Sequence, residues 1–141
     1  MQRGRRIAFD YGDVRIGVAV SDPDSILSSP LTTLRSDSKS LSKEILAIFE
    51  KIEPIQIFVG KPALLSGNLG SASEKAEEFA KRLAALIDVE ILMVDERMST
   101  VSAARNLREA GKNAKDSKSS IDMAAAVAIL EFGIEIQKRK L

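Results

Sequence analysis

The 141-residue chain contains no cysteine and no histidine, and only 4% of it is aromatic. Without cysteine there is neither a disulfide framework nor a thiolate zinc site, which is compatible with a reducing compartment, so we expect a cytoplasmic protein. Without histidine, Ser-His-Asp and Cys-His catalysis, imidazole metal sites and the usual general base near neutral pH are excluded. The side chains left for chemistry are carboxylates, lysine, arginine, serine, threonine and the single Tyr11.

Long hydrophobic runs and a charge bias are also missing. No stretch reaches the roughly 18 consecutive apolar residues of a membrane span, and no signal-peptide-like segment precedes Asp10. We therefore expect no membrane partner. The net charge is +1, from 21 basic and 20 acidic side chains, so nucleic-acid binding must come from local clusters. Basic clusters occur at 3–6, 112–118 and 138–140, although each is also typical of a solvated surface.

Apolar and turn patterns predict a β-β-β-α-β-α-β order followed by two further helices, within one domain that is large enough to bury a core. The expected strands are 5–10, 14–21, 31–34, 55–60 and 90–94. The expected helices are 41–52, 73–86 with a capping box from Ser71, 99–109 and a last one capped by Ser119 or Ser120. Gly12 is predicted to supply a positive φ in the turn of the first hairpin. A hairpin-connected triplet followed by crossovers predicts an α/β fold, a mixed sheet with helices on both faces.

Acidic residues follow two of the predicted strands. Asp10 comes directly after an apolar strand, where a carboxylate is costly to bury unless a cation or several hydrogen-bond donors compensate. Asp95 and Glu96 follow strand 90–94. If the two strands are parallel, these carboxylates emerge at the same edge, where ligand sites form in such sheets. Because side chains alternate along a strand, only one of Asp95 and Glu96 can point into a shared site, and either can be that one.

Asp122, in the first turn of the predicted last helix, is a third acidic candidate. The alanines at 124–126 would let this helix approach the sheet closely. Taken alone, each residue has an ordinary structural explanation. Asp122 can interact with the helix dipole, Asp10 can be a turn residue, and residues 95–97 can form a surface ion-pair cluster. Taken together, converging carboxylates repel one another, and a divalent cation is the simplest neutraliser, with oxygen ligation favouring Mg²⁺ or Mn²⁺. Two such ions about 4 Å apart can activate water and stabilise the leaving oxygen in phosphodiester cleavage.

Five sequence blocks occur in an order that resembles one known family: DYGDVRIGVAVSD (10–22), VGKP (59–62), GNLGSASEKAEEFAKRL (67–83), VDERMST (94–100) and SSIDMAAAVAILE (119–131). They are similar to the successive motifs of the YqgF/RuvX family, the RNase H-like pre-16S rRNA nucleases that are also called Holliday-junction-resolvase-like proteins. The match is collinear from about Arg6 to the last helix, nearly the whole chain.

The resemblance implies one RNase H-like nuclease domain over 1–141, with sheet order 3-2-1-4-5 and the first three strands antiparallel. It also implies a divalent-metal endonuclease, with Mg²⁺ or Mn²⁺ in a two-metal site, that acts on structured nucleic acid, mainly in maturing the 5′ end of 16S rRNA. By motif, Asp10, Glu96 (or Asp95) and Asp122 are the catalytic carboxylates, and Asp10, Glu96 and Asp122 hold the metal.

The expected contacts to the nucleic acid are all cationic: Arg15, Lys61, Arg97, Lys112, Lys115 and Lys118. Arg15 and Arg97 are implied by the family motifs, whereas Lys61 stands where many relatives have an apolar residue and adds one candidate phosphate contact. The three other lysines come from the basic loop 112–118. Because aromatic residues are scarce, recognition of shape and backbone is more plausible than base stacking.

Several alternatives stay open beside pre-rRNA processing by a monomer or homodimer. A Holliday junction resolvase would cut branched DNA and would call for a two-fold dimer. A non-catalytic nucleic-acid-binding module is the second alternative, although all three acidic positions are present here. The Asp-x-Gly hairpin of the actin and sugar-kinase superfamily is a weaker rival, because those proteins need two such domains and a longer chain.

Overall fold

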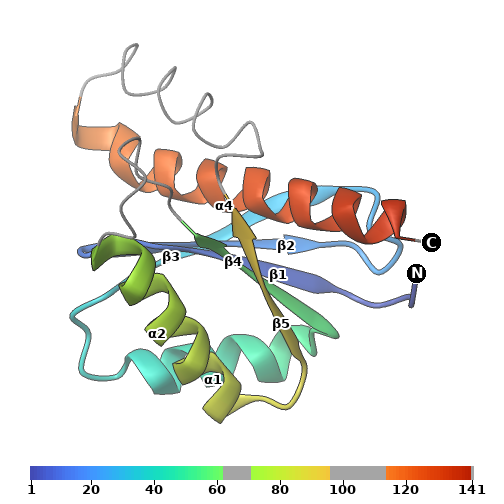
Figure 1. Ribbon diagram of the computed structural model, residues 1–141. Coiled ribbons are helices and arrows are strands. Elements are labelled where there is room, and N and C mark those ends of the chain that lie inside the picture. Colours follow the sequence, from blue (N-terminus) through green and yellow to red (C-terminus); the bar gives the residue numbers. More distant parts are fainter. Residues whose placement is uncertain (62–70, 96–113, 141) are drawn as a thin grey trace.

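A five-stranded mixed sheet in the order β3-β2-β1-β4-β5 forms the centre of the molecule (Figure 1). The computed structural model describes residues 1–61, 71–95 and 114–140, with only the backbone described for 71–72 and 114–121. The strands are β1 (Arg6–Tyr11), β2 (Arg15–Ser21), β3 (Ser28–Arg35), β4 (Gln56–Lys61) and β5 (Glu90–Asp95). β2 pairs antiparallel with β1 and β3, and β4 pairs parallel with β1 and β5. The predicted α/β fold and strand order are confirmed.

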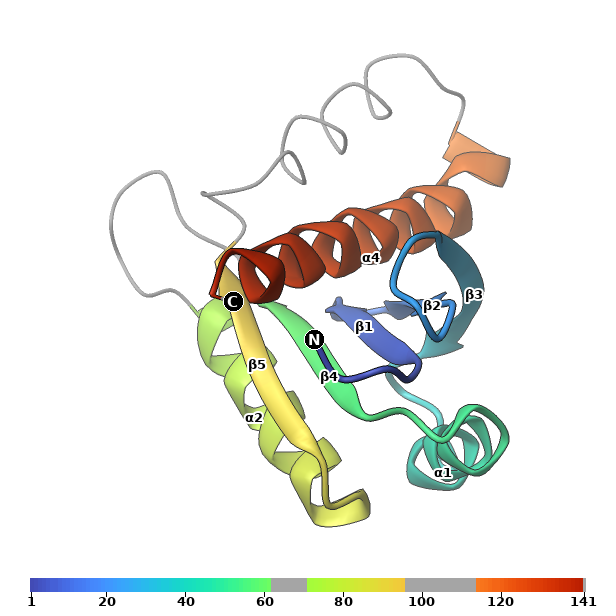
Figure 2. The ribbon, with the colours of Figure 1, turned by 90° about the vertical axis from the view of Figure 1, so that its right-hand side faces the viewer.

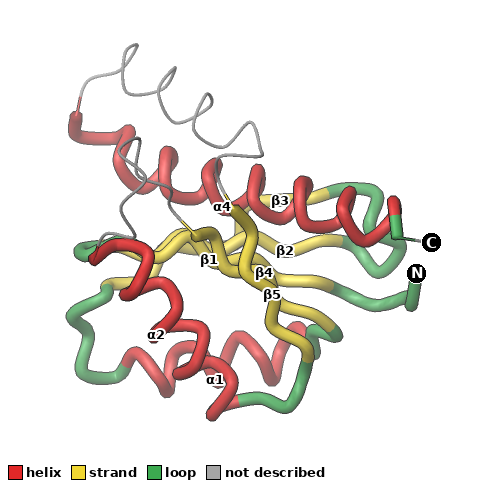
Figure 3. The backbone as a smooth tube through the Cα atoms, viewed as in Figure 1, coloured by secondary structure: helices red, strands yellow, loops and turns green. Residues whose placement is uncertain are grey.

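Helices cover both faces of the sheet. α1 (Leu41–Ile52) and α2 (Ser71–Leu86) lie on one face, and α4 (Ala114–Arg139) runs across the other (Figures 1 and 2). The strands form one continuous layer between these helices in the tube view (Figure 3). None of the helices in the described ranges has the length and apolarity needed to cross a bilayer.

The core is divided by the sheet into two clusters. Ile7 and Phe9 of β1 pack with buried side chains of α1 and α2, whereas Ala8 between them packs under α4 with Ala125 and Ile129. This alternation follows from the strand period of two. It assigns a face to every strand residue, including those at the acidic edge.

Most element boundaries lie close to their predicted positions. α1 spans the predicted residues and is followed by the C-cap residue Glu53, whose φ of 53° is left-handed and whose N–H donates to the carbonyl of Phe49. β3 is longer than predicted and includes Pro30. An edge strand tolerates this proline because one side of it needs no partner. The predicted helix 99–109 lies outside the described residues.

Two predictions about local structure were wrong. Gly12 does not have a positive φ; a Cβ there would instead lie 2.6 Å from the carbonyl oxygen of Arg15, so close approach explains the glycine. The last helix begins at Ala114 rather than after Ser119 or Ser120. Alanine and lysine before these serines favour helix, and a serine within a helix is only weakly unfavourable.

Candidate active site

The carboxyl ends of β1, β4 and β5 lie at one edge of the sheet, which we call the acidic edge. Asp10 is the penultimate residue of β1 and Asp95 is the last of β5, and the parallel pairing through β4 brings both to this edge, as predicted. β2 begins and β3 ends here, with Arg15 directly opposite Arg35. Lys61 ends β4 opposite Asp95, so the edge combines acidic and basic side chains from all five strands.

The two acidic residues at this edge point to opposite faces. Asp10 follows the direction of Ala8, which packs under α4, whereas Asp95 follows that of Met93, which packs against the cluster of α1 and α2. Of the two open alternatives, the face of Asp95 thus disfavours Asp95 as a partner of Asp10 and leaves Glu96 as the remaining prediction. Glu96 and Arg97 lie outside the described residues, so their roles stay predictions.

α4 approaches the sheet closely at Gly17, the residue that pairs with Asp10 across β1 and β2. A Cβ on Gly17 would overlap the backbone carbonyl of Asp122 and would lie 3.0 Å from the nitrogen of Met123. Only glycine therefore allows this approach. The bare backbone at Gly17 brings the α4 segment at Asp122 onto the face toward which Asp10 points.

An ion pair secures Asp122 at the acidic edge. Arg15 donates from Nε to Oδ2 of Asp122 at 3.0 Å, and the two side chains are 26% and 24% exposed. Asp122 was predicted in the first turn of its helix, but it lies about two turns inside α4. The helix dipole, which acts within about one turn of the terminus, therefore does not explain this carboxylate.

The carboxylates have the right chemistry for a hard divalent cation, but the described residues supply only part of a site. Asp10 is buried, with 8% of its surface exposed, and Asp122 contacts Arg15 on the α4 side of the sheet. Carboxylate oxygens are the ligands that Mg²⁺ and Mn²⁺ prefer. Within residues 1–61, 73–95 and 122–140, no three acidic side chains converge closely enough to hold a metal. The third predicted ligand, Glu96, lies beyond these ranges.

The predicted cationic residues are divided between the two faces. Lys61 forms an ion pair with Glu77 of α2 at 3.0 Å, on the face opposite Arg15. Tyr11 also faces α2, where its ring lies 4.9 Å from that of Phe79. Neither residue lies beside Arg15 and Asp122.

The lysines of the basic loop are only partly described. Lys115 and Lys118 fall in the first turns of α4, where the backbone alone is described, and Lys112 lies outside the described residues. Their contacts to nucleic acid stay predictions.

Two residues of the acidic edge were missed by sequence reasoning. Gly17 carried a usable signal, because an isolated glycine in an apolar strand often marks a close backbone approach. Arg35 carried none, since only the register of β3 against β2 places it opposite Arg15.

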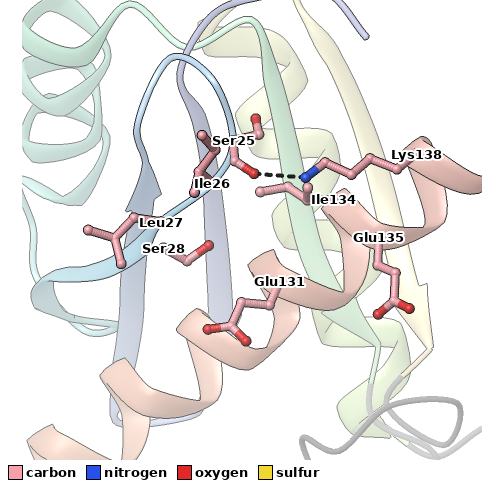
Figure 4. Close-up of a pocket in the computed structure, with 8 residues that line it drawn as sticks. All are labelled: Ser25, Ile26, Leu27, Ser28, Glu131, Ile134, Glu135 and Lys138. Atoms are coloured by element: carbon pink, nitrogen blue, oxygen red, sulfur yellow. Dashed lines mark hydrogen bonds between the residues drawn. The ribbon is translucent and has the colours of Figure 1, made fainter.

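A cavity of about 340 Å³ lies far from the acidic edge, between the β2–β3 loop and the C-terminal part of α4 (Figure 4). Lys138 spans it and donates to the carbonyl oxygen of Ser25 at 3.2 Å. Ser25 is also held by the buried Arg6, which donates to its Oγ at 2.7 Å. Desolvation lowers the pKa of Arg6, yet a guanidinium stays charged near neutral pH. This cavity is thus bounded by a structural polar network and is separate from Asp10 and Asp122.

A family model described as "RuvX: Holliday junction resolvase" matches residues 4–135. The chain belongs to the RuvX family. A Streptomyces avermitilis protein named "Putative pre-16S rRNA nuclease" is 43% identical over 140 residues, covering 98% of this chain and 90% of that protein. A Rhodococcus erythropolis protein of the same name is 45% identical over 143 residues, with coverages of 97% and 81%. The resemblance drawn from the five sequence blocks is confirmed.

The fold of this RuvX-family chain is also found among solved structures. Thermus thermophilus RuvC in complex with a Holliday junction substrate superposes with a TM-score of 0.58 and covers 96% of each chain. The sequence identity is 13%, so this likeness concerns the fold alone. It agrees with the RNase H-like architecture expected from the sequence.

Proposed function

We propose that this RuvX-family chain is a divalent-metal-dependent endonuclease that acts as a single domain and matures the 5′ end of pre-16S rRNA. The proposal is supported by the names of its relatives, which are 43% and 45% identical. Its structural support is the close approach at Gly17, which brings Asp10 and the Asp122 segment together on one face of the sheet. A junction resolvase is the second candidate, because the matching family model carries that description.

Each residue has a distinct role in this proposal. The β1–β2 ladder holds the backbone of Asp10, and Arg15 holds the carboxylate of Asp122. Both residues are thus positioned before substrate arrives, and Glu96 completes the ligand set. Mg²⁺ or Mn²⁺ held by these carboxylates would lower the pKa of a water and stabilise charge on the leaving oxygen, so that no histidine base would be required. Arg15 keeps Asp122 oriented and presents positive charge to a nearby phosphate.

Cleavage assays with Asp10→Asn test this function. A labelled precursor rRNA fragment and a four-way DNA junction are incubated with Mg²⁺, Mn²⁺ or EDTA. Outer partners of metal ligands typically contribute about 10- to 100-fold, so we expect loss of a ligand itself to reduce cleavage by at least about 100-fold. Asp13→Asn is the matched control, because Asp13 lies in the same hairpin but forms its ion pair with Lys75 of α2. This control should cleave like the wild type.

The outcomes separate the alternatives. Metal-dependent cutting of the rRNA fragment supports the maturation role, and cutting of the junction alone by a two-fold dimer supports a resolvase. Tight binding without cutting under any metal would refute the nuclease and favour a binding module. A second readout is thermal unfolding: Mn²⁺ should raise the Tm of the wild type but not that of Asp10→Asn.

A further inference from the structure

Arg35 lies beside Arg15 on the α4 face of the sheet. The two residues are directly opposite on β2 and β3, and their neighbours Ile16 and Leu34 point together into the other core cluster. Opposed residues in an antiparallel pair share a face, with Cα atoms about 4.5 to 5.5 Å apart. Because Arg15 contacts Asp122 of α4, Arg35 is also placed on the face toward which Asp10 points.

Placing two arginines directly opposite each other costs free energy of folding. Like charges directly opposite on neighbouring strands destabilise a sheet. Each arginine is neutralised separately, Arg15 by Asp122 and Arg35 by Asp37. The second pair is highly exposed, at 61% and 71%, and its two contacts are both 3.3 Å long. Exposed pairs of this kind contribute little to stability, so they are easily exchanged.

Asp37 contacts Arg35 in the manner of a phosphate. Its two carboxylate oxygens accept from Nε and Nη2, the parallel fork that arginine also offers to a phosphodiester. The hydrogen bond from Arg35, followed by its charge, lowers the pKa of Asp37, so this carboxylate is ionised at neutral pH. An anion therefore already occupies Arg35 at the margin of the acidic edge.

We propose that Arg35 and Arg15 bind adjacent phosphates of the nucleic-acid backbone beside the acidic edge, and that Asp37 occupies Arg35 until a phosphate displaces it. Arg35 thus adds a phosphate contact on the edge strand β3 to that of Arg15 on β2. Asp37 acts as an internal competitor that lowers affinity. This inference rests on the proposed function, because it assumes a nucleic-acid substrate.

Binding is measured in EDTA, so that no cutting occurs, with a labelled double-helical precursor rRNA stem and a four-way DNA junction over a series of salt concentrations. Arg35→Gln should weaken binding about two- to five-fold, the range supplied by an exposed ion pair. It should also reduce the slope of log affinity against log salt by about 0.7 to 0.9. Asp37→Asn should tighten binding, and Arg35→Lys should retain most of the affinity, because a point charge still binds phosphate.

The chain offers a matched control pair far from the acidic edge. Arg3, which precedes β1, and Asp24 of the β2–β3 loop also form an exposed arginine–aspartate ion pair, with an Nε–Oδ1 distance of 2.9 Å. Arg3→Gln and Asp24→Asn change the net charge as the two test variants do. They should leave both affinity and salt slope near the wild-type values.

Opposite shifts for Arg35→Gln and Asp37→Asn, absent from the control pair, would support the inference. Equal effects in the test pair and the control pair would mean that binding follows net charge alone, and would overturn the inference. An unchanged salt slope in Arg35→Gln would overturn it as well. If the wild type cuts and Arg35→Gln binds like it, the inference fails while the nuclease stands. If the wild type neither binds nor cuts, the proposed function fails and the inference falls with it.

Discussion

Gly17 is the residue on which the geometry of the acidic edge depends. It pairs with Asp10, and its missing Cβ leaves the space into which the backbone of α4 fits at Asp122. The neighbouring Ala8, Ala19, Ala125 and Ala126 are all buried and small, which allows the same close packing along the helix. One glycine thus connects the packing of an entire helix to the position of one carboxylate.

Gly17→Ala should damage both stability and activity. The added Cβ meets backbone rather than a flexible side chain, so α4 must move. Overpacking of this kind costs about 1 to 3 kcal/mol, measurable by urea denaturation. Cleavage per folded molecule should also fall, because Asp122 moves away from Asp10.

Val18→Ala is the control for this prediction. Val18 is fully buried in the other cluster, and its truncation should cost roughly 1 to 3 kcal/mol without moving α4. Activity per folded molecule should then persist. Equal activity in both folded variants would contradict the role given to Gly17.

At the scale of elements, the β2–β3 loop is shaped by the carboxylate of Asp22. This side chain accepts backbone N–H groups from Ile26 at 2.7 Å, Leu27 at 2.8 Å and Asp24 at 3.3 Å. These hydrogen bonds, that of Leu27 first, lower the pKa of Asp22. The conformation of the loop is therefore most stable when Asp22 is ionised. The same conformation leaves Ile26 and Leu27 82% and 65% exposed to solvent.

Asp22→Asn should make stability less dependent on pH. Because the folded-state pKa is depressed, the ionised carboxylate stabilises the fold above its unfolded value of about 3.9. That contribution is lost as the pH falls through the folded-state pKa. The variant should thus have a lower urea midpoint than the wild type at neutral pH, and the difference should vanish in acid.

Asp88→Asn is the matched control, since Asp88 is an exposed aspartate outside this loop. It should show no comparable change in urea midpoint between neutral and acidic pH. A neutral-pH midpoint for Asp22→Asn equal to that of the wild type would refute the loop assignment.

At the scale of the whole molecule, one sheet joins two core clusters into a single unit. Ile45 of α1 is fully buried on one face, and Ile129 of α4 is fully buried on the other. The two clusters share the strands but are separated by the sheet. Unfolding of either layer would expose the backbone and side chains of the same strands.

Ile45→Val and Ile129→Val should each lower the free energy of unfolding by about 0.5 to 1.5 kcal/mol. Their effects should add within about 0.5 kcal/mol, because the sites share no contact. Tyr11 fluorescence, which reports on the Phe79 side, and far-UV circular dichroism should follow one coincident transition. Separate transitions would mean that the α4 layer unfolds independently.

Local patterns in the sequence already predicted much of this architecture. Helix α1 has the predicted bounds, and each of the five strands overlaps its predicted range, because apolar periodicity and turn residues act over a few neighbours. The crossover rule also predicts that Asp10 and Asp95 lie at one edge, since parallel strands end at the same side of a sheet.

The amino-acid pattern was sufficient to predict the elements, their order and the edge at which Asp10 and Asp95 lie. Three features could not be predicted in this way: Asp10 and Asp95 point to opposite faces, Gly17 admits α4 at Asp122, and Arg35 lies opposite Arg15. These features depend on strand register and helix docking, which join residues far apart in the chain. Composition and local periodicity do not specify such pairings. Packing of side chains on both faces of the sheet selects one strand register among the possible ones.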